Sequence, residues 1–271
     1  MSDTKTISET KVEYFTKADI YKVREQGGKG LPIGKVYDPE RFWNDLGEDY
    51  YKAFTSQQQL QANTPWIIDR IKMLGVATML DIGCGFGRIL PFLLEAGVVK
   101  SCVGVDISDS ILKCAEDYLN PTPSDNMKLD DYRNKLKETK MDDMLKIKLE
   151  ELLIQQYAKR KQSPPDFRDK STLKKADARE LSFESDSFDC VLSNETLQHL
   201  CPEDAEDVLL HMVRASKNSI VLVERWAYPG EHSQPDLWSH NYVEILNKLG
   251  VNVAQSSVVS NGIQGIVALK R

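Results

Sequence analysis

The sequence predicts an α/β fold with a doubly wound, mostly parallel sheet and helices on both faces. Short apolar runs alternate with helical patterns, as where ATMLDIG (77–83) is followed by RILPFLLEAG (88–97). Parallel strands need crossovers of this kind. Near the C-terminus, Asn261-Gly262 separates two apolar runs. That dipeptide is typical of a type I′ hairpin, so we expect the last strand to return antiparallel.

The remaining elements are expected from the same patterns. The first 30 residues are polar and end in GGKG, which predicts a loosely ordered lead-in. A helix is expected over 56–75, with Ser56 as its N-cap and Gly75 at its end. Strands are expected over 101–108, 188–195 and 218–226, and helices over 109–120 and 202–216.

Composition places the chain in an ordinary class. The net charge is −6 over 271 residues, which gives no general attraction to nucleic acid or anionic membranes. The N-terminus is polar and no apolar run has the length of a membrane span. Five cysteines include no CxxC pair, which favours reduced thiols and a cytoplasmic protein. His232, His240 and Glu224 match no strong ligand spacing, so no metal is expected.

One short motif gives the strongest indication of a ligand-binding site. LDIGCGFGRIL (80–90) places Asp81 at the end of an apolar strand and then glycine at 83, 85 and 87. Glycine permits positive φ and lets a ligand lie against bare backbone, and the helix start that follows offers free N–H groups. A dinucleotide fingerprint would need a third glycine at position 88, which is Arg88.

This word resembles the first motif of class I S-adenosylmethionine-dependent methyltransferases. In VGVDIS (103–108), the resemblance implies that Asp106 binds the ribose hydroxyls; in KADAREL (175–181), it implies that Asp177 meets the adenine amino group. SFDCVLSNETLQHL (187–200) is similar to the fourth strand and the turn that faces the methyl acceptor. The resemblance implies a Rossmann-like, seven-stranded sheet and S-adenosylmethionine as cofactor. The cofactor-binding residues that it implies in these motifs are Asp81, Gly83, Cys84, Gly85, Gly87, Arg88, Asp106, Ile107, Asp177, Ala178 and Asn194.

The segments on either side of the cofactor motifs show a second resemblance, to a narrower group of methyltransferases. VYDPERFWNDLGEDYY (36–51) and VERWAYPGEHSQPDLWSHNYVEILNKLG (223–250) are similar to methyltransferases found among polysaccharide and other cell-surface biosynthetic proteins. We therefore expect residues 1–55 to be a lead-in and an aromatic lid, with Tyr37 and Trp43 covering the cofactor. Residues 56–271 then form the methyltransferase domain.

Residues 121–175 interrupt that domain as an expected helical insertion. The insertion holds 14 Lys and Arg against 10 Asp and Glu. A substrate lid, a homodimer contact, a docking site for an anionic partner and a merely solvated helical elaboration all remain open.

Three residues are candidates for catalysis on the acceptor side. His199 is a candidate general base, with a packing role as the alternative. For Glu224 we consider contact with an acceptor hydroxyl or amine, support of His199, or an ion pair with Arg225 or Arg88. For His240 we consider contact with the acceptor or capping of the following helix. We expect methyl transfer to an oxygen or nitrogen of a small molecule or glycan. The alternative is a protein or RNA methyltransferase that docks through 121–175, although SNET (193–196) replaces an NPPY-type word and argues against nucleic-acid bases. A third reading is a cofactor-binding protein that has lost catalysis.

Overall fold

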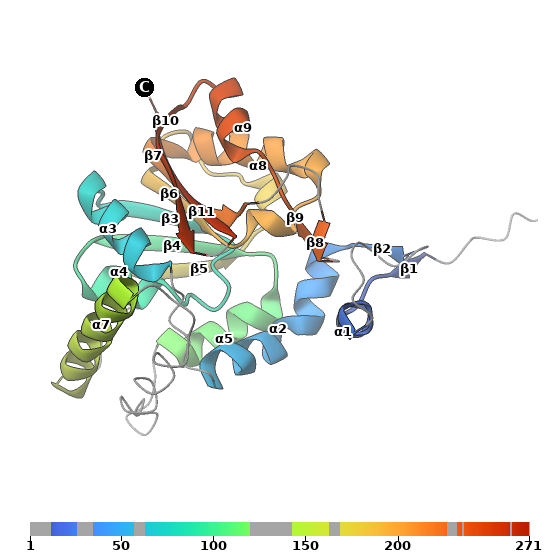
Figure 1. Cartoon of the computed structure of the whole chain (residues 1–271), viewed down its shortest axis with the longest axis horizontal. Coiled ribbons are helices and arrows are strands. Elements are labelled where there is room, and N and C mark those ends of the chain that lie inside the picture. The colour runs from blue at the N-terminus through green and yellow to red at the C-terminus, as the bar shows by residue number, and fades with distance from the viewer. Residues whose placement is uncertain are drawn as a thin grey trace, which may run out of the picture.

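A computed structural model describes residues 12–25, 35–56, 63–119, 143–162, 169–226, 232–234, 236–260 and 262–270. Its centre is a seven-stranded sheet with the order β10-β11-β7-β6-β3-β4-β5 (Figure 1). Strands β3 to β7 run parallel, whereas β11 is antiparallel to both β7 and β10. The predicted Rossmann-like sheet with an antiparallel last strand is confirmed; Asn261 itself lies outside the described residues.

The sheet strands are bounded as follows: β3 Thr78–Ile82, β4 Ser101–Asp106, β5 Ser171–Lys175, β6 Phe188–Asn194, β7 Ser216–Arg225, β10 Asn252–Ser260 and β11 Ile263–Leu269. The helices around them are α3 Thr64–Leu74, α4 Leu90–Glu95, α5 Asp109–Leu119, α7 Asp143–Gln162, α8 Pro202–Ala215 and α9 Tyr242–Lys248, with 3-10 turns η1 Ala178–Glu180 and η2 Leu197–His199. Before the sheet come β1 Glu13–Tyr14, α1 Lys17–Glu25, β2 Lys35–Val36 and α2 Pro39–Ser56; β8 His232–Gln234 and β9 Leu237–Trp238 follow β7.

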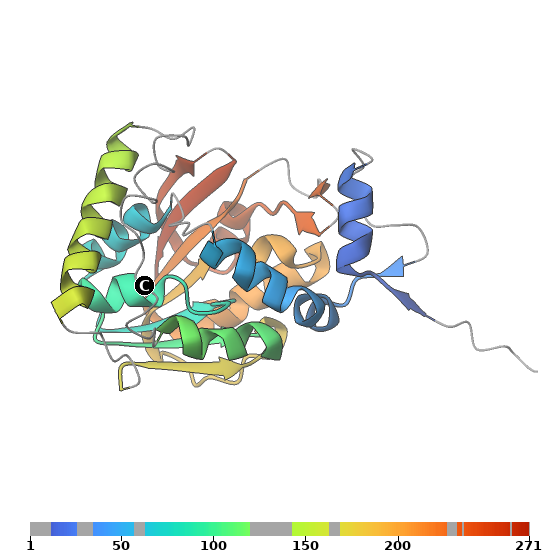
Figure 2. The ribbon, with the colours of Figure 1, turned by 90° about the horizontal axis from the view of Figure 1, so that it is seen from below.

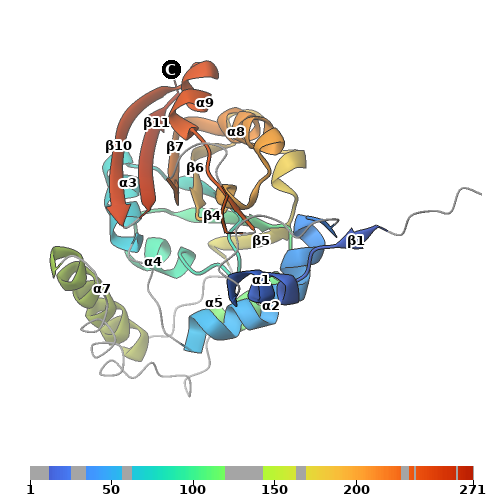
Figure 3. The same cartoon turned by 45° about the vertical axis from the view of Figure 1, so that its right-hand side comes forward.

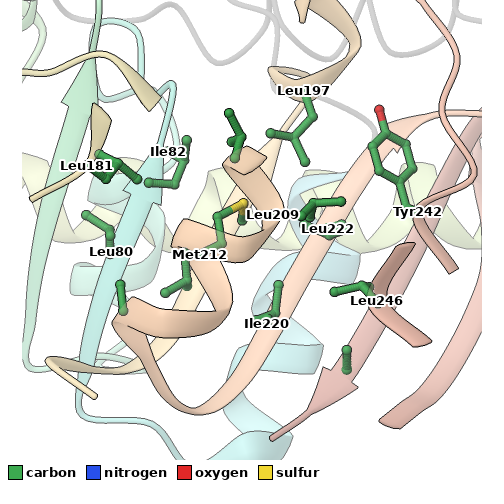
Figure 4. Close-up of a cluster of buried hydrophobic side chains, with 14 of the residues drawn as sticks. Leu80, Ile82, Leu181, Leu197, Leu209, Met212, Ile220, Leu222, Tyr242 and Leu246 are labelled. Carbon is green, nitrogen blue, oxygen red and sulfur yellow. The ribbon is translucent and has the colours of Figure 1, made fainter. Parts of the chain in front are cut away.

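Alternation along the strands divides the core in two, because successive side chains point to opposite faces of a sheet. Met79 and Val221 face the layer that contains α3 and α4, while Leu80 and Leu222 face α8 and α9. Figure 3 shows these helices on the two sides of the sheet. Figure 4 shows the second cluster, in which Met212 of α8 lies among the strand leucines and isoleucines. Strands covered on both faces read as near-continuous apolar runs, which is the pattern of the sequence.

The N-terminal segment contains more structure than its polar composition predicts. Within residues 12–25, Phe15 and Ile20 are buried and pack with Tyr37, Phe42 and Trp238 in a separate aromatic cluster. Phe15 stacks on Phe42 at 5.6 Å between ring centroids. The expectation of a loose lead-in is therefore wrong for 12–25, because a few large apolar side chains suffice to anchor a polar helix.

Helix α2 packs across the start of α5. Ser110 Oγ donates to the main-chain oxygen of Asn44 at 2.9 Å, and Ser108 Oγ donates to that of Trp43 at 3.0 Å. Gly47 makes this close approach feasible, since a Cβ there would lie 2.0 Å from Ser110 Oγ. The aromatic stretch thus becomes a helix fixed against the sheet domain.

Two boundaries differ from those expected. The helix expected over 56–75 begins at Thr64, because Ser56 ends α2 and residues 57–62 lie outside the description; Gly75 ends it in the left-handed conformation, as expected. Residues 171–175, the last five of the expected insertion, form the edge strand β5. Because β5 alternates exposed with half-buried side chains at the sheet edge, its sequence does not read as a buried strand.

The described part of the insertion is the helix α7. Leu149 is fully buried and Leu152 packs against the core beside α3, while Lys148 forms an ion pair with Asp69 of α3 at 2.8 Å. Met144 and Ile147 are exposed. Figure 2 shows α7 and α1 at opposite ends of the molecule. No helix within the described residues is long and apolar enough to cross a membrane.

Candidate active site

A cavity of about 410 Å³ opens at the carboxyl ends of the parallel strands. Loops after β3, β4, β5 and β6 form one part of its wall, and α2 forms the facing part. Ligands of open α/β sheets bind at this edge. Eleven of the thirteen residues predicted for the cofactor line the cavity: Trp43, Asp81, Gly83, Cys84, Gly85, Arg88, Asp106, Ile107, Asp177, Ala178 and Asn194.

The three glycines of the motif all have positive φ values, but each lacks a side chain for a different structural reason. Gly83, Gly85 and Gly87 have φ of 65°, 57° and 76°. A Cβ on Gly83 would lie 2.0 Å from the Thr196 side chain, so this glycine allows two loops to meet. A Cβ on Gly85 would have no neighbour nearer than 3.7 Å, so this glycine leaves room at the cavity wall. Gly87 does not line the cavity; it faces Leu119 and Leu173.

Two acidic residues lie beneath the glycine loop. Asp106 accepts hydrogen bonds from the backbone N–H of Gly85 and of Ser108, each at 2.9 Å, which orients its carboxyl group at the cavity wall. Burial raises its pKa, although those hydrogen bonds oppose the shift. Burial, together with the nearby Asp106, raises the pKa of Asp81 to about 8. The site therefore places two interacting acids at the ends of adjacent strands.

Asp177 is held by a residue that the sequence analysis did not single out. Arg179 reaches it with Nη2 at 2.6 Å and Nε at 3.0 Å, and also donates its backbone N–H at 2.9 Å. Burial would raise the pKa of Asp177, but the guanidinium outweighs it and the pKa is lowered. This bidentate pair fixes the carboxylate in place on the wall. The sequence does contain a signal for Arg179, because an arginine two positions after an acidic residue at a turn is well placed to pair with it.

His199 lies on the opposite part of the wall. Its Nδ1 is 2.9 Å from the main-chain oxygen of Asp236 and 3.7 Å from Oδ2 of the same residue. The imidazole meets Trp43 of α2 edge-to-face at 4.7 Å between ring centroids. Both His199 and Asp236 line the cavity, as the placement of His199 after the fourth parallel strand predicts. Asp236 is 37 residues away and no sequence pattern links the two.

Glu224 does not reach the cavity. Its buried carboxyl group accepts from Ser193 Oγ at 2.7 Å and from the backbone N–H groups of Thr196 and Gln198 at 3.1 and 3.3 Å. Burial raises its pKa to about 7 against these hydrogen bonds. The expectation that Glu224 touches the acceptor is wrong, because this residue lies on the same strand face as Leu222. It holds the loop that carries His199.

His240 and Tyr37 are also displaced from the wall. His240 is buried beside Tyr242, with ring centroids 5.5 Å apart, and burial lowers its pKa while the main chain of Leu197 and Leu200 opposes that shift. Tyr37 packs against Trp238 in the N-terminal aromatic cluster. Neither residue lines the cavity, since each is covered by apolar neighbours. Trp43 of α2 does line it. That residues 36–54 cover the cofactor stays a prediction, and Tyr37 does not reach the cavity as that prediction requires.

Tyr50 and Asn63 complete the site. Tyr50 lines the cavity seven residues after Trp43, the spacing that puts two side chains on one helix face and could have identified it. Buried Asn63 donates to Asn194 Oδ1 at 2.7 Å and to Glu195 Oε1 at 3.1 Å, which ties the start of α3 to the wall. Glu195 has φ of 57°, an uncommon conformation for a residue with a side chain. No three His, Cys, Asp or Glu side chains form a metal-binding group within the described ranges.

The comparison with family models identifies the domain. Residues 80–144 and 132–223 match the model of a methyltransferase domain, so the match spans just over half of the chain. The chain belongs to the methyltransferase domain family. This methyltransferase is of class I and depends on S-adenosylmethionine. No curated protein sequence matches it.

Solved structures share the fold of this methyltransferase. A chain in the complex of the Haloferax volcanii Trm112 methyltransferase activator with a methyltransferase has a TM-score of 0.57 at 14% identity, covering 83% of this chain and 96% of that one. Magnesium protoporphyrin IX methyltransferase from Synechocystis, solved with bound S-adenosylhomocysteine, has a TM-score of 0.54 at 14% identity, covering 86% and 98%. A methyltransferase from Aquifex aeolicus has a TM-score of 0.51 at 14% identity, covering 81% and 97%.

The cavity of this methyltransferase fits its cofactor. Gly85 leaves a bare backbone surface beside Asp106, whose oriented carboxyl group suits a pair of ribose hydroxyls. Asp177 and Ala178 continue the wall on the side expected for adenine. Apolar and aromatic residues of α2, including Trp43 and Leu46, face these groups and limit the access of water.

Proposed function

We propose that the enzyme transfers a methyl group to a hydroxyl or amine of a small, sugar-like molecule, with His199 as the general base. The observation that supports this proposal is the hydrogen bond between His199 Nδ1 and the main-chain oxygen of Asp236, at 2.9 Å. A carbonyl oxygen only accepts, so Nδ1 carries the proton in the neutral ring. In that tautomer Nε2 is the ring nitrogen that carries the lone pair and takes up the proton.

A base is needed for this class of acceptor. When bound, S-adenosylmethionine supplies an activated methyl group on a positively charged sulfur. A hydroxyl loses its proton as its oxygen gains the methyl group, whereas an ammonium must lose a proton before its nitrogen can attack. We assign the acceptance of that proton to His199, which lines the cavity. The nearby Asp236 favours the imidazolium that results, because its Oδ2 lies 3.7 Å from Nδ1.

The composition of the wall favours an acceptor rich in hydrogen-bond donors. Asp49, Glu195 and Asp236 line the same cavity, and each supplies carboxyl oxygens. Arg88 and Arg179 also line the cavity. Arg179 is engaged by Asp177, as Asp49 is by Lys17 at 3.0 Å. The carboxyl groups of Glu195 and Asp236 therefore carry this argument. A polyol or an amine matches such a wall better than a phosphate or a carboxylic acid does. The cover by α2 suits a small acceptor better than a large one.

The alternative, a protein or RNA acceptor docked on the insertion, is supported less well. Residues 143–162 contribute nothing to the cavity wall, and α7 is tied to α3 by the Lys148–Asp69 ion pair. A docking surface on this helix would have to act at a distance from the chemistry.

The test is a pair of histidine variants assayed after a screen of sugars, sugar nucleotides, amines and small acids. His199→Ala is expected to lower turnover by roughly 10²–10⁴-fold with the affinity for S-adenosylmethionine unchanged. His211→Ala is the matched control, because His211 Nδ1 also lies near a main-chain oxygen, that of Ala178 at 3.3 Å, but the residue does not line the cavity. Wild-type turnover should rise with pH through the range in which imidazole titrates and then level off.

Two outcomes contradict the proposal. Full activity of His199→Ala would mean that the acceptor needs no base, as for a carboxylate. Methyl transfer to protein or RNA fractions alone would exclude a small acceptor and direct attention to residues 121–175.

A further inference from the structure

The aromatic side chains of α2 connect the two halves of the active site. Trp43 and Tyr50 both line the cavity and meet edge-to-face at 5.7 Å between ring centroids. At one end of this pair, Tyr50 Cε1 lies 4.0 Å from the position that a Cβ on Gly85 would take. At the other end, Trp43 meets His199 at 4.7 Å. The two rings therefore span the interval between the cofactor cradle and the proposed base.

The transferred methyl group must lie in that interval. The donor is bound at the glycine loop and the acceptor on the side of His199, so the bond that breaks and the bond that forms are between them. Sulfur in S-adenosylmethionine carries a permanent positive charge, whereas sulfur in the product, S-adenosylhomocysteine, is a neutral thioether. Aromatic rings attract cations, with tryptophan the strongest, and more so where water is excluded.

We infer that Trp43 and Tyr50 form an aromatic wall that recognises the sulfonium charge, so that the enzyme binds its methyl donor in preference to the demethylated product. The inference rests on the proposed placement of the acceptor beside His199, but not on the identity of the acceptor or on His199 being a base. It assigns α2 a role in product release, because the attraction ends when the methyl group, and with it the charge on sulfur, is transferred.

The wall is positioned by the segment that holds the cofactor. Asp106 accepts from the backbone N–H of Ser108 at 2.9 Å, and Ser108 Oγ donates to the main-chain oxygen of Trp43 at 3.0 Å. Asn44 Oδ1 accepts from the same Ser108 hydroxyl at 3.1 Å. The backbone of Trp43 is thus tied to Asp106 through two hydrogen bonds, and edge-to-face contacts with Tyr50 and His199 hold the ring itself.

The test measures binding by calorimetry, with no acceptor present. The measured quantity is the ratio of the dissociation constant of S-adenosylhomocysteine to that of S-adenosylmethionine. Trp43→Leu and Tyr50→Leu are each expected to lower this ratio, by about 5- to 30-fold for the tryptophan. Trp43→Phe and Tyr50→Phe keep a ring and are expected to retain most of the ratio. Tyr51→Leu is the control on the same helix, since Tyr51 packs edge-to-face on Phe86 and does not line the cavity.

A ratio that is unchanged in both leucine variants would overturn the inference. An equal loss of affinity for both ligands would also overturn it, because the rings would then contribute packing alone. If a leucine variant fails to fold, the wild-type protein decides through sinefungin, which carries an ammonium group in place of the sulfonium. The wild type should bind this cation more tightly than the neutral thioether, and the absence of that preference would overturn the inference. None of these outcomes depends on whether His199 is a base.

Discussion

The side of the cavity at the glycine loop and the side at His199, where we propose that the acceptor binds, are built in different ways. They are called the cofactor side and the acceptor side below. On the cofactor side, one continuous word of sequence supplies a loop of positive-φ glycines, and the neighbouring strand supplies Asp106 to hold it. On the acceptor side, His199 is positioned by Asp236 and Trp43, which come from segments far away along the chain. The positions of residues in a local motif follow from the order of the strands. The positions of side chains from distant segments depend instead on how the loops pack against one another.

The largest expected effects distinguish Gly83 from Gly85 within the glycine motif, one in stability and the other in cofactor affinity. Gly83→Val should destabilise the fold by about 2–5 kcal/mol, since it combines a left-handed backbone with a Cβ that would lie 2.0 Å from Thr196. Gly85→Val should cost about 1–2 kcal/mol of backbone strain but weaken cofactor binding by at least about tenfold, because its side chain enters the cavity wall. Chemical denaturation and calorimetry measure the two quantities.

A third glycine calibrates this comparison. Gly97 has φ of 65° and no atom within 4 Å of its added Cβ, so Gly97→Val reports backbone strain alone. Equal stability of the Gly83 and Gly97 variants would show that the contact with Thr196 is relieved by movement, and the distinction between the glycines would fail.

A smaller effect is expected at Glu224, whose carboxyl group holds the loop that carries His199. This effect is on the pH dependence of stability. Glu224 is buried, and its pKa is raised to about 7 from an ordinary value near 4.5. The folded protein therefore binds this proton more tightly than the unfolded chain does, so the stability that the proton confers is complete below pH ~4.5 and is lost as the pH rises to ~7. Glu224→Gln fixes a neutral group and should lack this dependence.

The measurement is the free energy of unfolding of both proteins between pH 5 and 8. The wild type should lose about 1–3 kcal/mol relative to Glu224→Gln as the pH rises. Asp81, whose pKa is also raised, contributes equally to both proteins and cancels. Glu206→Gln on the exposed face of α8 is the control. Parallel curves for wild type and Glu224→Gln would mean that the hydrogen bonds from Thr196 and Gln198 keep the carboxylate ionised.

The sequence predicts which residues of the glycine loop and of the neighbouring strand lie at the cavity, because the information for that placement is local. The run from Asp81 to Arg88 determines a strand, a turn and a helix start within ten residues, and the parallel order of β3 and β4 then places Asp106 beside the turn. Strand alternation also could have corrected one error: Glu224 shares its face with Leu222 and Ile220, which point toward α8 and α9 and away from the cavity.

The acceptor side could be predicted only in part, because its contacts join distant segments. His199 follows directly from its place after β6, but its partner Asp236 lies in a short loop before β9 whose path no periodicity reveals. The sequence SHNY (239–242) predicts a functional histidine, yet Ser239, His240 and Tyr242 are buried, and His240 lies next to η2. The distinctive sequence at 239–242 thus contributes buried polar side chains near the site and does not contact the cavity.

The smallest expected effect concerns the manner in which Asp236 acts. Its main-chain oxygen accepts from His199 at 2.9 Å, whereas its carboxyl oxygen, at 3.7 Å, is beyond hydrogen-bond distance. Asp236→Asn keeps the main chain and removes only the charge, so turnover should fall by less than about tenfold. In the background of His199→Ala the same substitution should have no further effect on turnover, since both changes act through one imidazole. A loss as large as that of His199→Ala would show that the carboxyl group, and not the main chain, holds the base, and the acceptor side would then depend on side chains alone.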